Sequence, residues 1–168
     1  GVEVFGEGPV WVPGCGLGHD VRLLASHGLQ VLGLDLASVA IEAARSQLPV
    51  LEERYELMDF LDPAQRQGRQ AGAIWEHTCF CAIQPSRRAD YARSAAEILP
   101  PGGTLAGVFF LTPYDLGKET DGPPYGVTVE AIDDCFGPWF ERVDAWQPET
   151  AYPGREGREW LAVYKRLT

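Results

Sequence analysis

The sequence predicts an α/β fold in which helices cover both faces of a seven-stranded, mainly parallel sheet. Apolar runs of strand length alternate along the chain with segments of helical period, which is the pattern of successive β-α units. The last two apolar runs have no helix between them, so we expect one antiparallel strand at that end of the sheet. Because no repeat, low-complexity tract or linker divides the chain, we expect one domain over residues 1–168.

Two strand–helix units make up the first part of the chain. We expect a buried strand over residues 8–13 and a helix over 17–27, which Gly28 closes. The apolar side chains that share one face of this helix are Leu17, Val21, Leu24 and Ala25. A second strand, residues 30–34, precedes a helix over 38–48, with Ser38 as the expected N-cap and Pro49 just beyond its end.

Five more strands and two helices are expected in the rest of the chain. Strands near residues 54–58 and 71–75 flank a polar turn, 62–70, that has room for a short helix. A helix over 86–99 ends at the Pro-Pro-Gly-Gly run 100–103, and the almost wholly apolar strand 104–111 follows, which suits a central position. After a Gly-, Pro- and Asp-rich loop, 112–126, we expect a short helix over 128–136 and the final strands 140–147 and 159–167.

Composition excludes several classes of partner. A formal net charge of −10 opposes binding to phosphate backbones and anionic lipids, so we expect no nucleic-acid and no membrane partner. The strongly apolar stretch 105–111 is far shorter than the roughly 20 residues that span a bilayer. Four cysteines without CxxC spacing indicate reduced thiols in a cytoplasmic protein without zinc or another metal. We expect a monomer that acts on a small molecule.

A glycine-rich turn follows the first predicted strand. Gly14, Gly16 and Gly18 stand at alternate positions where the ligand crevice of an open parallel sheet lies, although one such glycine alone would indicate only a tight turn. The dinucleotide motif GxGxxG fails because His19 stands where its last glycine would be, and a P-loop lysine is missing. The turn therefore favours an adenosyl ligand without phosphates, such as S-adenosylmethionine.

Acidic residues end the next two strands. Asp35 lies about twenty residues beyond the turn, where an acid accepts hydrogen bonds from ribose hydroxyls; it could equally cap the following helix, and the two roles are compatible. Met58, Asp59 and Phe60 suit an adenine pocket, with Asp59 accepting from the exocyclic amine and an apolar neighbour packing on the ring. The alternative is a surface acid beside core residues.

These segments together resemble the thiopurine S-methyltransferase family, which includes the plant thiol and halide methyltransferases. The resemblance covers nearly the whole chain in order. The segments that support it are the turn 12–20, Gly33-Leu34-Asp35, Asp59-Phe60, Ile74-Trp75-Glu76, the run 80–85 with Arg88 and Tyr91, Pro101-Gly102-Gly103, and Gly122-Pro123-Pro124-Tyr125. It implies a Rossmann-like class I methyltransferase that uses S-adenosylmethionine and releases S-adenosylhomocysteine.

The resemblance also implies roles for individual residues. Gly14, Cys15, Gly16 and Gly18 would wrap the methionine end of the cofactor, and Asp35 with Leu36 would bind the ribose. Met58, Asp59 and Phe60 would hold the adenine. Glu76, His77 and Thr78, just after the fourth strand, would line the floor between cofactor and acceptor. On the acceptor side lie Arg88 and Tyr91, with Pro123, Pro124 and Tyr125 closing over it.

Methyl transfer from a sulfonium needs alignment and exclusion of water more than a protein nucleophile. We name His77 as a candidate base for a thiol, with a structural imidazole as the alternative, and Arg88 as a candidate catalytic residue, with a surface ion-pair partner as the alternative. Cys79 and Cys81, one expected to be buried and one semi-buried, receive no catalytic role.

The predicted reaction is methyl transfer from S-adenosylmethionine to a small acceptor, preferably a thiol-type sulfur. Halide, metalloid, oxygen or nitrogen acceptors are the alternatives, as is a cofactor-binding protein without turnover. A nicotinamide-dependent oxidoreductase is disfavoured by His19. The resemblance also implies a lid segment before the first strand, where this sequence has only residues 1–8. If the lid is missing, we expect weaker cofactor binding and slower turnover; if it was cleaved or is unresolved, we expect the native protein to be fully active.

Overall fold

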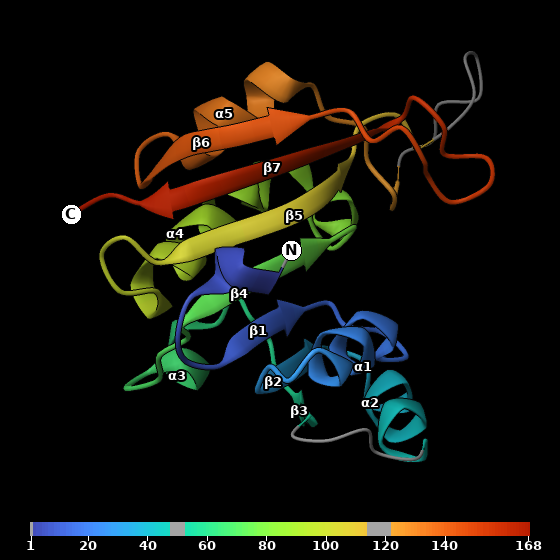
Figure 1. The fold of residues 1–168 in the computed structure, drawn as a ribbon, viewed down its shortest axis with the longest axis vertical. Coiled ribbons are helices and arrows are strands. Elements are labelled where there is room, and N and C mark those ends of the chain that lie inside the picture. Colours follow the sequence, from blue (N-terminus) through green and yellow to red (C-terminus); the bar gives the residue numbers. More distant parts are fainter. Residues whose placement is uncertain (1, 48–52, 114–121) are drawn as a thin grey trace.

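A computed structural model describes residues 2–47, 53–113 and 122–168. One sheet joins seven strands in the order β3-β2-β1-β4-β5-β7-β6, with helices on both faces (Figure 1). The strands are β1 Val10–Pro13, β2 Val31–Asp35, β3 Glu53–Leu57, β4 Ala73–His77, β5 Thr104–Phe110, β6 Phe140–Trp146 and β7 Glu159–Arg166. Only β7 runs antiparallel to its neighbours, β5 and β6, as the sequence predicts.

The helical segments follow the expected order. They are η1 Val2–Phe5, α1 His19–Ser26, α2 Ser38–Arg45, α3 Pro63–Arg66, η2 Phe80–Ala82, η3 Pro85–Arg87, α4 Arg88–Ile98 and α5 Val129–Phe136. The short helix α3 lies within the polar turn where the sequence has room for one. Residue 48 of the second predicted helix and Pro49 lie outside the described residues, as does part of the loop 112–126.

Each face of the sheet has its own apolar layer. Val21 of α1 and Ile41 of α2 pack with Val12 on one face. On the other face, α4 and α5 pack through Tyr91 and Phe136. Phe136 lies between rings, stacked on Tyr164 with a centroid distance of 5.0 Å and tilted against Phe80 at 5.6 Å. Both layers are apolar because parallel strands are covered on two sides.

Parallel pairing brings the carboxyl ends of β1, β2, β3 and β4 to one edge of the sheet. Pro13 pairs with Leu34, and Asp35 pairs with Leu57 of β3. The segments that leave this edge are the glycine turn, the start of α2, residues 58–62 and the loop after β4. They are the segments in which the sequence places the cofactor residues.

The first helix begins two residues later than predicted, at His19. Gly14, Gly16 and Gly18 have φ values of 63°, 52° and 77°, so the backbone stays outside the right-handed helical region through Gly18. Leu17 therefore belongs to the turn, and its side chain is 48% exposed. Its expected place on the buried face of the helix was wrong.

Two further boundaries differ from the expectation. Ser38 is the first residue of α2 and not its N-cap, because Ala37 has the extended backbone of that position. Strand β4 continues through His77, since Glu76 and His77 pair with Gly107 and Val108 of the seven-residue strand β5. Glu76 and His77 thus belong to the strand that was expected to end at residue 75.

Among the described residues, no helix has the length and apolar character needed to cross a membrane. No cluster of three metal-ligating His, Cys, Asp or Glu side chains occurs in that part of the chain either.

Candidate active site

A cavity of about 300 Å³ lies at the carboxyl edge of the sheet. Residues from the first four strand ends line it, and they include these predicted site residues: Gly14, Asp35, Leu36, Met58, Asp59, Phe60, Thr78 and Tyr91. Sequence reasoning missed or left unassigned the remaining lining residues, which are Leu61, Cys79, Ala82, Ile83 and Arg87. The last four follow β4 in a loop whose apolar residues give no periodic signal.

The glycine turn is tied to the end of β2. The Gly16 amide donates to Asp35 Oδ2 at 2.9 Å, and the Cys15 amide donates to the Leu34 carbonyl at 2.9 Å. A Cβ added at Gly14 would come 2.7 Å from Cys79 Sγ, whereas no atom of the described residues lies within 4 Å of a Cβ built at Gly16. Gly14 is therefore needed for packing, and Gly16 borders open space that a ligand can fill.

Asp35 organises both the glycine turn and the start of α2. Its Oδ2 accepts from Gly16, and its Oδ1 accepts from the Ala37 amide at 2.9 Å. Each carboxylate oxygen has further lone-pair capacity, so the bonds to the protein leave room for ribose hydroxyls. The helix-end role and the ribose role are geometrically compatible, as the sequence suggests.

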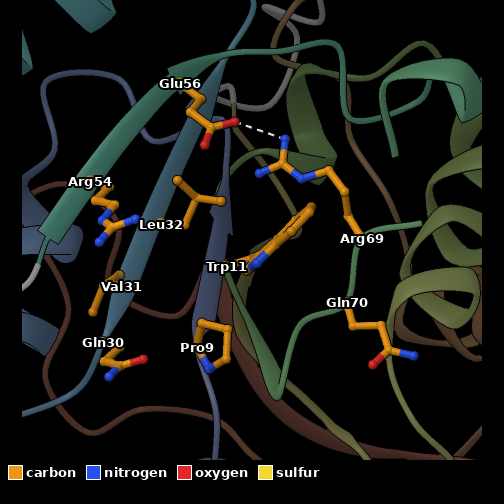
Figure 2. A pocket seen from close by; sticks show the side chains of 9 residues that line it. All are labelled: Pro9, Trp11, Gln30, Val31, Leu32, Arg54, Glu56, Arg69 and Gln70. Atoms are coloured by element: carbon orange, nitrogen blue, oxygen red, sulfur yellow. Dashed lines mark hydrogen bonds and ion pairs between the residues drawn. The ribbon is translucent and has the colours of Figure 1, made fainter. Parts of the chain in front are cut away.

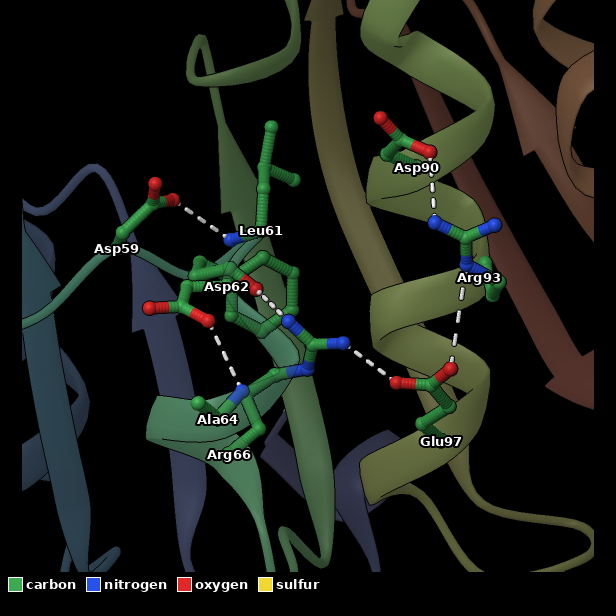
Figure 3. Close-up of polar contacts among 9 residues, drawn as sticks. Asp59, Leu61, Asp62, Ala64, Arg66, Asp90, Arg93 and Glu97 are labelled. Atoms are coloured by element: carbon green, nitrogen blue, oxygen red, sulfur yellow. Dashed lines mark hydrogen bonds and ion pairs between the residues drawn. The ribbon is translucent and has the colours of Figure 1, made fainter.

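Met58, Asp59 and Phe60 form one wall of the cavity. Asp59 Oδ1 accepts from the Leu61 amide at 2.8 Å, and the buried Arg66 donates to the Phe60 carbonyl at 2.7 Å (Figure 3). Met58 and Phe60 are largely buried, as expected of residues that present an apolar surface.

Arg66 links this wall to α4. Its guanidinium also forms an ion pair with Glu97 at 2.5 Å, as Figure 3 shows. Sequence reasoning missed Arg66, because an arginine in a polar turn gives no signal that distinguishes it from a solvated one.

Glu76 is fully buried beneath the loop after β4. Its Oε1 accepts from the Phe80 amide at 2.9 Å, and its Oε2 accepts from the Tyr91 hydroxyl at 2.7 Å. Burial raises the pKa of Glu76 to about 7 despite these two donors. Tyr91 is also fully buried, so its hydroxyl serves Glu76 within the protein. Its predicted contact with the acceptor stays a prediction.

The loop after β4 begins with a strained residue. Thr78 has a φ of 61°, a left-handed conformation that β-branched residues rarely adopt. Cys81 is buried and Cys79 half-buried, as expected. Burial raises the pKa of the Cys81 thiol to about 11 and that of Cys79 well above its usual value, so both thiols stay protonated near neutral pH.

Arg88 lies beneath the segment that was expected to close over the acceptor. Its guanidinium donates to the carbonyls of Tyr125 and Gly126 at 3.0 and 3.1 Å and lies over the Phe80 ring, 4.9 Å from its centroid. The Tyr125 amide in turn donates to the Cys81 carbonyl at 2.7 Å. Arg88 is only 8% exposed, so the alternative of a surface ion-pair partner was wrong. Pro123 and Pro124 lie exposed on this segment.

His77 pairs with an acid that sequence reasoning did not assign. Its Nδ1 lies 2.8 Å from Asp20 Oδ2, and both side chains are about one-third exposed. The hydrogen bond to Asp20 is the main reason that the pKa of His77 is raised above its usual value. Asp20 is the last residue of the turn 12–20, two residues after Gly18, but the motif gives no indication of its partner.

Other cavities occur among the described residues. One, of about 400 Å³, lies over Trp11 and Leu32, with Arg69 paired to Glu56 at its rim (Figure 2). A more apolar groove of about 440 Å³ lies between α1 and the strands β4, β5 and β7, and Asp20 borders it. Neither is lined by any of the predicted site residues.

The strand order with its antiparallel β7 and the ligand cavity at the carboxyl edge define a class I methyltransferase fold. A solved S-adenosylmethionine-dependent methyltransferase from Methanosarcina mazei matches this structure with a TM-score of 0.78 at 16% identity, over 96% of this chain and 93% of that one. A magnesium protoporphyrin IX methyltransferase from Synechocystis, solved with bound S-adenosylmethionine, matches with a TM-score of 0.71 at 14% identity, over 94% and 69%.

The chain belongs to the thiopurine S-methyltransferase (TPMT) family, whose family model matches residues 4–162. It is 32% identical over 167 residues to "Probable thiol methyltransferase 2" and 33% identical over 165 residues to "Thiocyanate methyltransferase 1", from Arabidopsis thaliana and Brassica oleracea. Each alignment covers 95% of this chain and 70% of the relative. A thiopurine S-methyltransferase from Pseudomonas fluorescens is 30% identical over 78% of this chain and 66% of its own length. The protein is an S-adenosylmethionine-dependent methyltransferase, as predicted.

Proposed function

We propose that this methyltransferase transfers the methyl group of S-adenosylmethionine to a small acceptor whose nucleophile is preferably a thiol-type sulfur. The observation on which the proposal depends is the cavity between the Gly16 turn and the loop after β4, with His77 at the end of the strand that leads into that loop. Relatives named as thiol and thiocyanate methyltransferases favour sulfur acceptors.

The cofactor residues are proposed from their placement. Gly14, Cys15, Gly16 and Gly18 would surround the methionine end, because Gly16 faces space that no described side chain fills. Asp35 with Leu36 would bind the ribose, and the wall of Met58, Asp59 and Phe60 would hold the adenine. Glu76, His77 and Thr78 would form the floor between cofactor and acceptor. Glu76, which is buried beneath this floor, would support it through its hydrogen bonds to Phe80 and Tyr91.

The proposed reaction requires the protein residues only to position the reactants and to remove a proton from a thiol acceptor. When bound, S-adenosylmethionine supplies an activated methyl group: the acceptor sulfur forms a bond to the methyl carbon as the old C–S electron pair passes to the sulfonium sulfur, giving S-adenosylhomocysteine. His77 would take the proton of a thiol acceptor, since raising the pKa of the imidazole brings it closer to that of a thiol, which is near 8.5. Arg88 would hold Pro123, Pro124 and Tyr125 in place beside the acceptor.

Cofactor binding can be tested with a matched pair of glycine variants. Gly16→Ala and Gly28→Ala both place a side chain at a positive φ, 52° and 85°, and neither new Cβ meets a described atom within 4 Å. We expect both to lose about 1 kcal/mol of stability, the cost of a left-handed residue. Only Gly16→Ala should weaken S-adenosylhomocysteine binding in calorimetry, by roughly tenfold or more. Equal affinities in the two variants, or no binding heat from the parent chain, would contradict the proposal.

The acceptor can be tested with a panel of thiols, halides, thiocyanate, alcohols and amines, with mass detection of methylated products. We expect thiols to give the highest kcat/KM. The second candidate is an anionic acceptor, which the thiocyanate methyltransferase relatives favour. An anion carries no proton to remove, so its methylation should be insensitive to His77→Gln, whereas alkyl thiol methylation should fall. A panel in which only alcohols or amines are methylated would contradict both candidates.

A further inference from the structure

The Asp20–His77 pair joins the two sides of the candidate active site. Asp20 lies in the first turn of α1, directly after the glycine turn, and His77 ends β4, directly before Thr78 of the cavity floor. Strands β1 and β4 are neighbours, so their carboxyl ends bring these two residues together across 57 positions of sequence. The Oδ2 to Nδ1 distance of 2.8 Å is that of a direct hydrogen bond.

We infer that Asp20 is a positioning residue for His77: its carboxylate holds the hydrogen of the imidazole on Nδ1 and leaves Nε2 free to accept the proton of the acceptor thiol. This inference rests on the proposed function. A carboxylate can only accept, so the ring nitrogen facing it must be the donor. The neutral imidazole is then fixed in one tautomer, and that tautomer has its lone pair on Nε2.

The surroundings of His77 suit a base. Three acidic groups favour the protonated ring when they are ionised, namely Asp20 from α1, its chain neighbour Glu76 and Glu159 of β7, while burial opposes it. Asp20 acts through a hydrogen bond as well as through charge. The Trp75 ring packs edge-to-face against the His77 ring, with the two centroids 6.2 Å apart, and so restricts the orientation of the imidazole.

The pair can be reached from outside the protein. Both side chains are about one-third exposed, and Asp20 borders the apolar groove of about 440 Å³ together with Leu23 and Trp75. A thiol acceptor can therefore reach the imidazole from solvent. The proton passes from sulfur to Nε2, the thiolate takes the methyl group, and the imidazolium returns the proton to water, so that the net products are a thioether, S-adenosylhomocysteine and one proton.

A purely structural role for Asp20 is the competing explanation, because an acid in the first turn of a helix is stabilising in any case. The two roles differ in how they depend on the acceptor. A thiol that is already ionised at neutral pH needs no base, whereas an alkyl thiol does. Loss of a positioning residue should therefore affect only the second, and loss of a structural residue should affect both.

The experiment compares Asp20→Asn with Glu130→Gln, which removes an exposed acid from the first turn of α5. For an alkyl thiol, we expect Asp20→Asn to lower kcat by roughly 10- to 100-fold and to move the acidic limb of the pH profile to lower pH, because the pKa of His77 falls. For an acidic aryl thiol, kcat should change less than about twofold. Asp20→Glu should restore part of the alkyl thiol activity, and Glu130→Gln should behave as the parent chain.

Equal losses with both thiols, or no loss with either, would overturn the inference while leaving the proposed function intact. A parent chain that methylates no thiol overturns the proposed function and, with it, the base role of His77. Long-range ¹H–¹⁵N NMR gives a readout that does not depend on turnover. The parent chain should show the Nδ1–H tautomer for His77 and Asp20→Asn should lose that preference; an Nε2–H tautomer in the parent would refute the positioning role.

Discussion

The buried carboxyl group of Glu76 makes the stability of the protein depend on pH in a predictable direction. The pKa of Glu76 is about 7 in the folded chain and near 4.5 in the unfolded chain. The folded chain therefore holds this proton more tightly than the unfolded chain does. The stability that this group contributes is fully present below pH 4.5 and is lost as the pH rises to about 7. The difference between the two pKa values corresponds to about 3 kcal/mol, of which about 2 kcal/mol falls between pH 5.5 and 8.5.

Glu76→Gln removes this dependence while keeping the shape of the side chain. The amide oxygen can still accept from the Phe80 amide, and the amide nitrogen can donate to the Tyr91 oxygen. The variant therefore has its own constant cost, but its stability should no longer fall as the pH rises. Relative to the parent chain, it should gain about 2 kcal/mol between pH 5.5 and 8.5.

Urea unfolding at a series of pH values measures this change directly. All other titrating groups are common to the two proteins, so the difference between their unfolding free energies isolates position 76. Asp62→Asn is the matched control, because Asp62 also accepts from a backbone amide, at 2.9 Å, but is not buried. A Glu76→Gln difference that stays constant from pH 5.5 to 8.5, or that moves against the variant, would refute the assignment of a raised pKa.

Two further predictions concern the walls of the cavity. Asp35→Ala should weaken S-adenosylhomocysteine binding by roughly 1–3 kcal/mol in calorimetry, because the Gly16 amide loses its acceptor and the ribose loses its proposed partner. The control Asp62→Ala, which loses the cap of α3, should lower stability but leave the affinity unchanged. An Asp35→Ala affinity equal to that of the parent chain would mean that Asp35 serves only the fold. Thr78→Gly should raise the unfolding free energy by about 0.5–1 kcal/mol, because relief of the backbone strain at a φ of 61° outweighs the entropy cost of glycine. A lower unfolding free energy in urea would show instead that the Thr78 side chain stabilises the cavity floor.

The sequence predicts the sheet and most of the cavity because both depend on local patterns. Apolar periodicity indicates the order of strands and helices, and the glycine turn indicates the edge at which a ligand binds. The errors lie at boundaries. Leu17 fits the helical period but lies between two positive-φ glycines of the turn, Gly16 and Gly18. Glu76 and His77 look like loop residues, although the length of β5 lets strand pairing continue to them.

Contacts between distant segments could not be predicted. The pairing of Asp20 with His77, the bond from Arg66 to the Phe60 carbonyl and the burial of Arg88 each depend on tertiary neighbours. A charged residue in a turn or at a helix start is most often solvated, and nothing in its own segment distinguishes the buried case. The sequence therefore gives the type of each residue but does not predict its tertiary partner.

Buried or half-buried polar side chains hold each loop of the cavity in place. Asp35 fixes the glycine turn through the Gly16 amide, and Glu76 fixes the loop after β4 through the Phe80 amide. Arg66 fixes the wall of residues 58–60 through the Phe60 carbonyl. Backbone groups have no side-chain rotamers, so a hydrogen bond to them sets the path of the loop directly. For Glu76 this arrangement costs stability as the pH rises toward 7, because the ionised carboxylate is held where water cannot reach it. A hydrophobic residue in its place could pack well, yet the loop would lose the bond that holds Phe80, and the floor of the cavity would lose its shape.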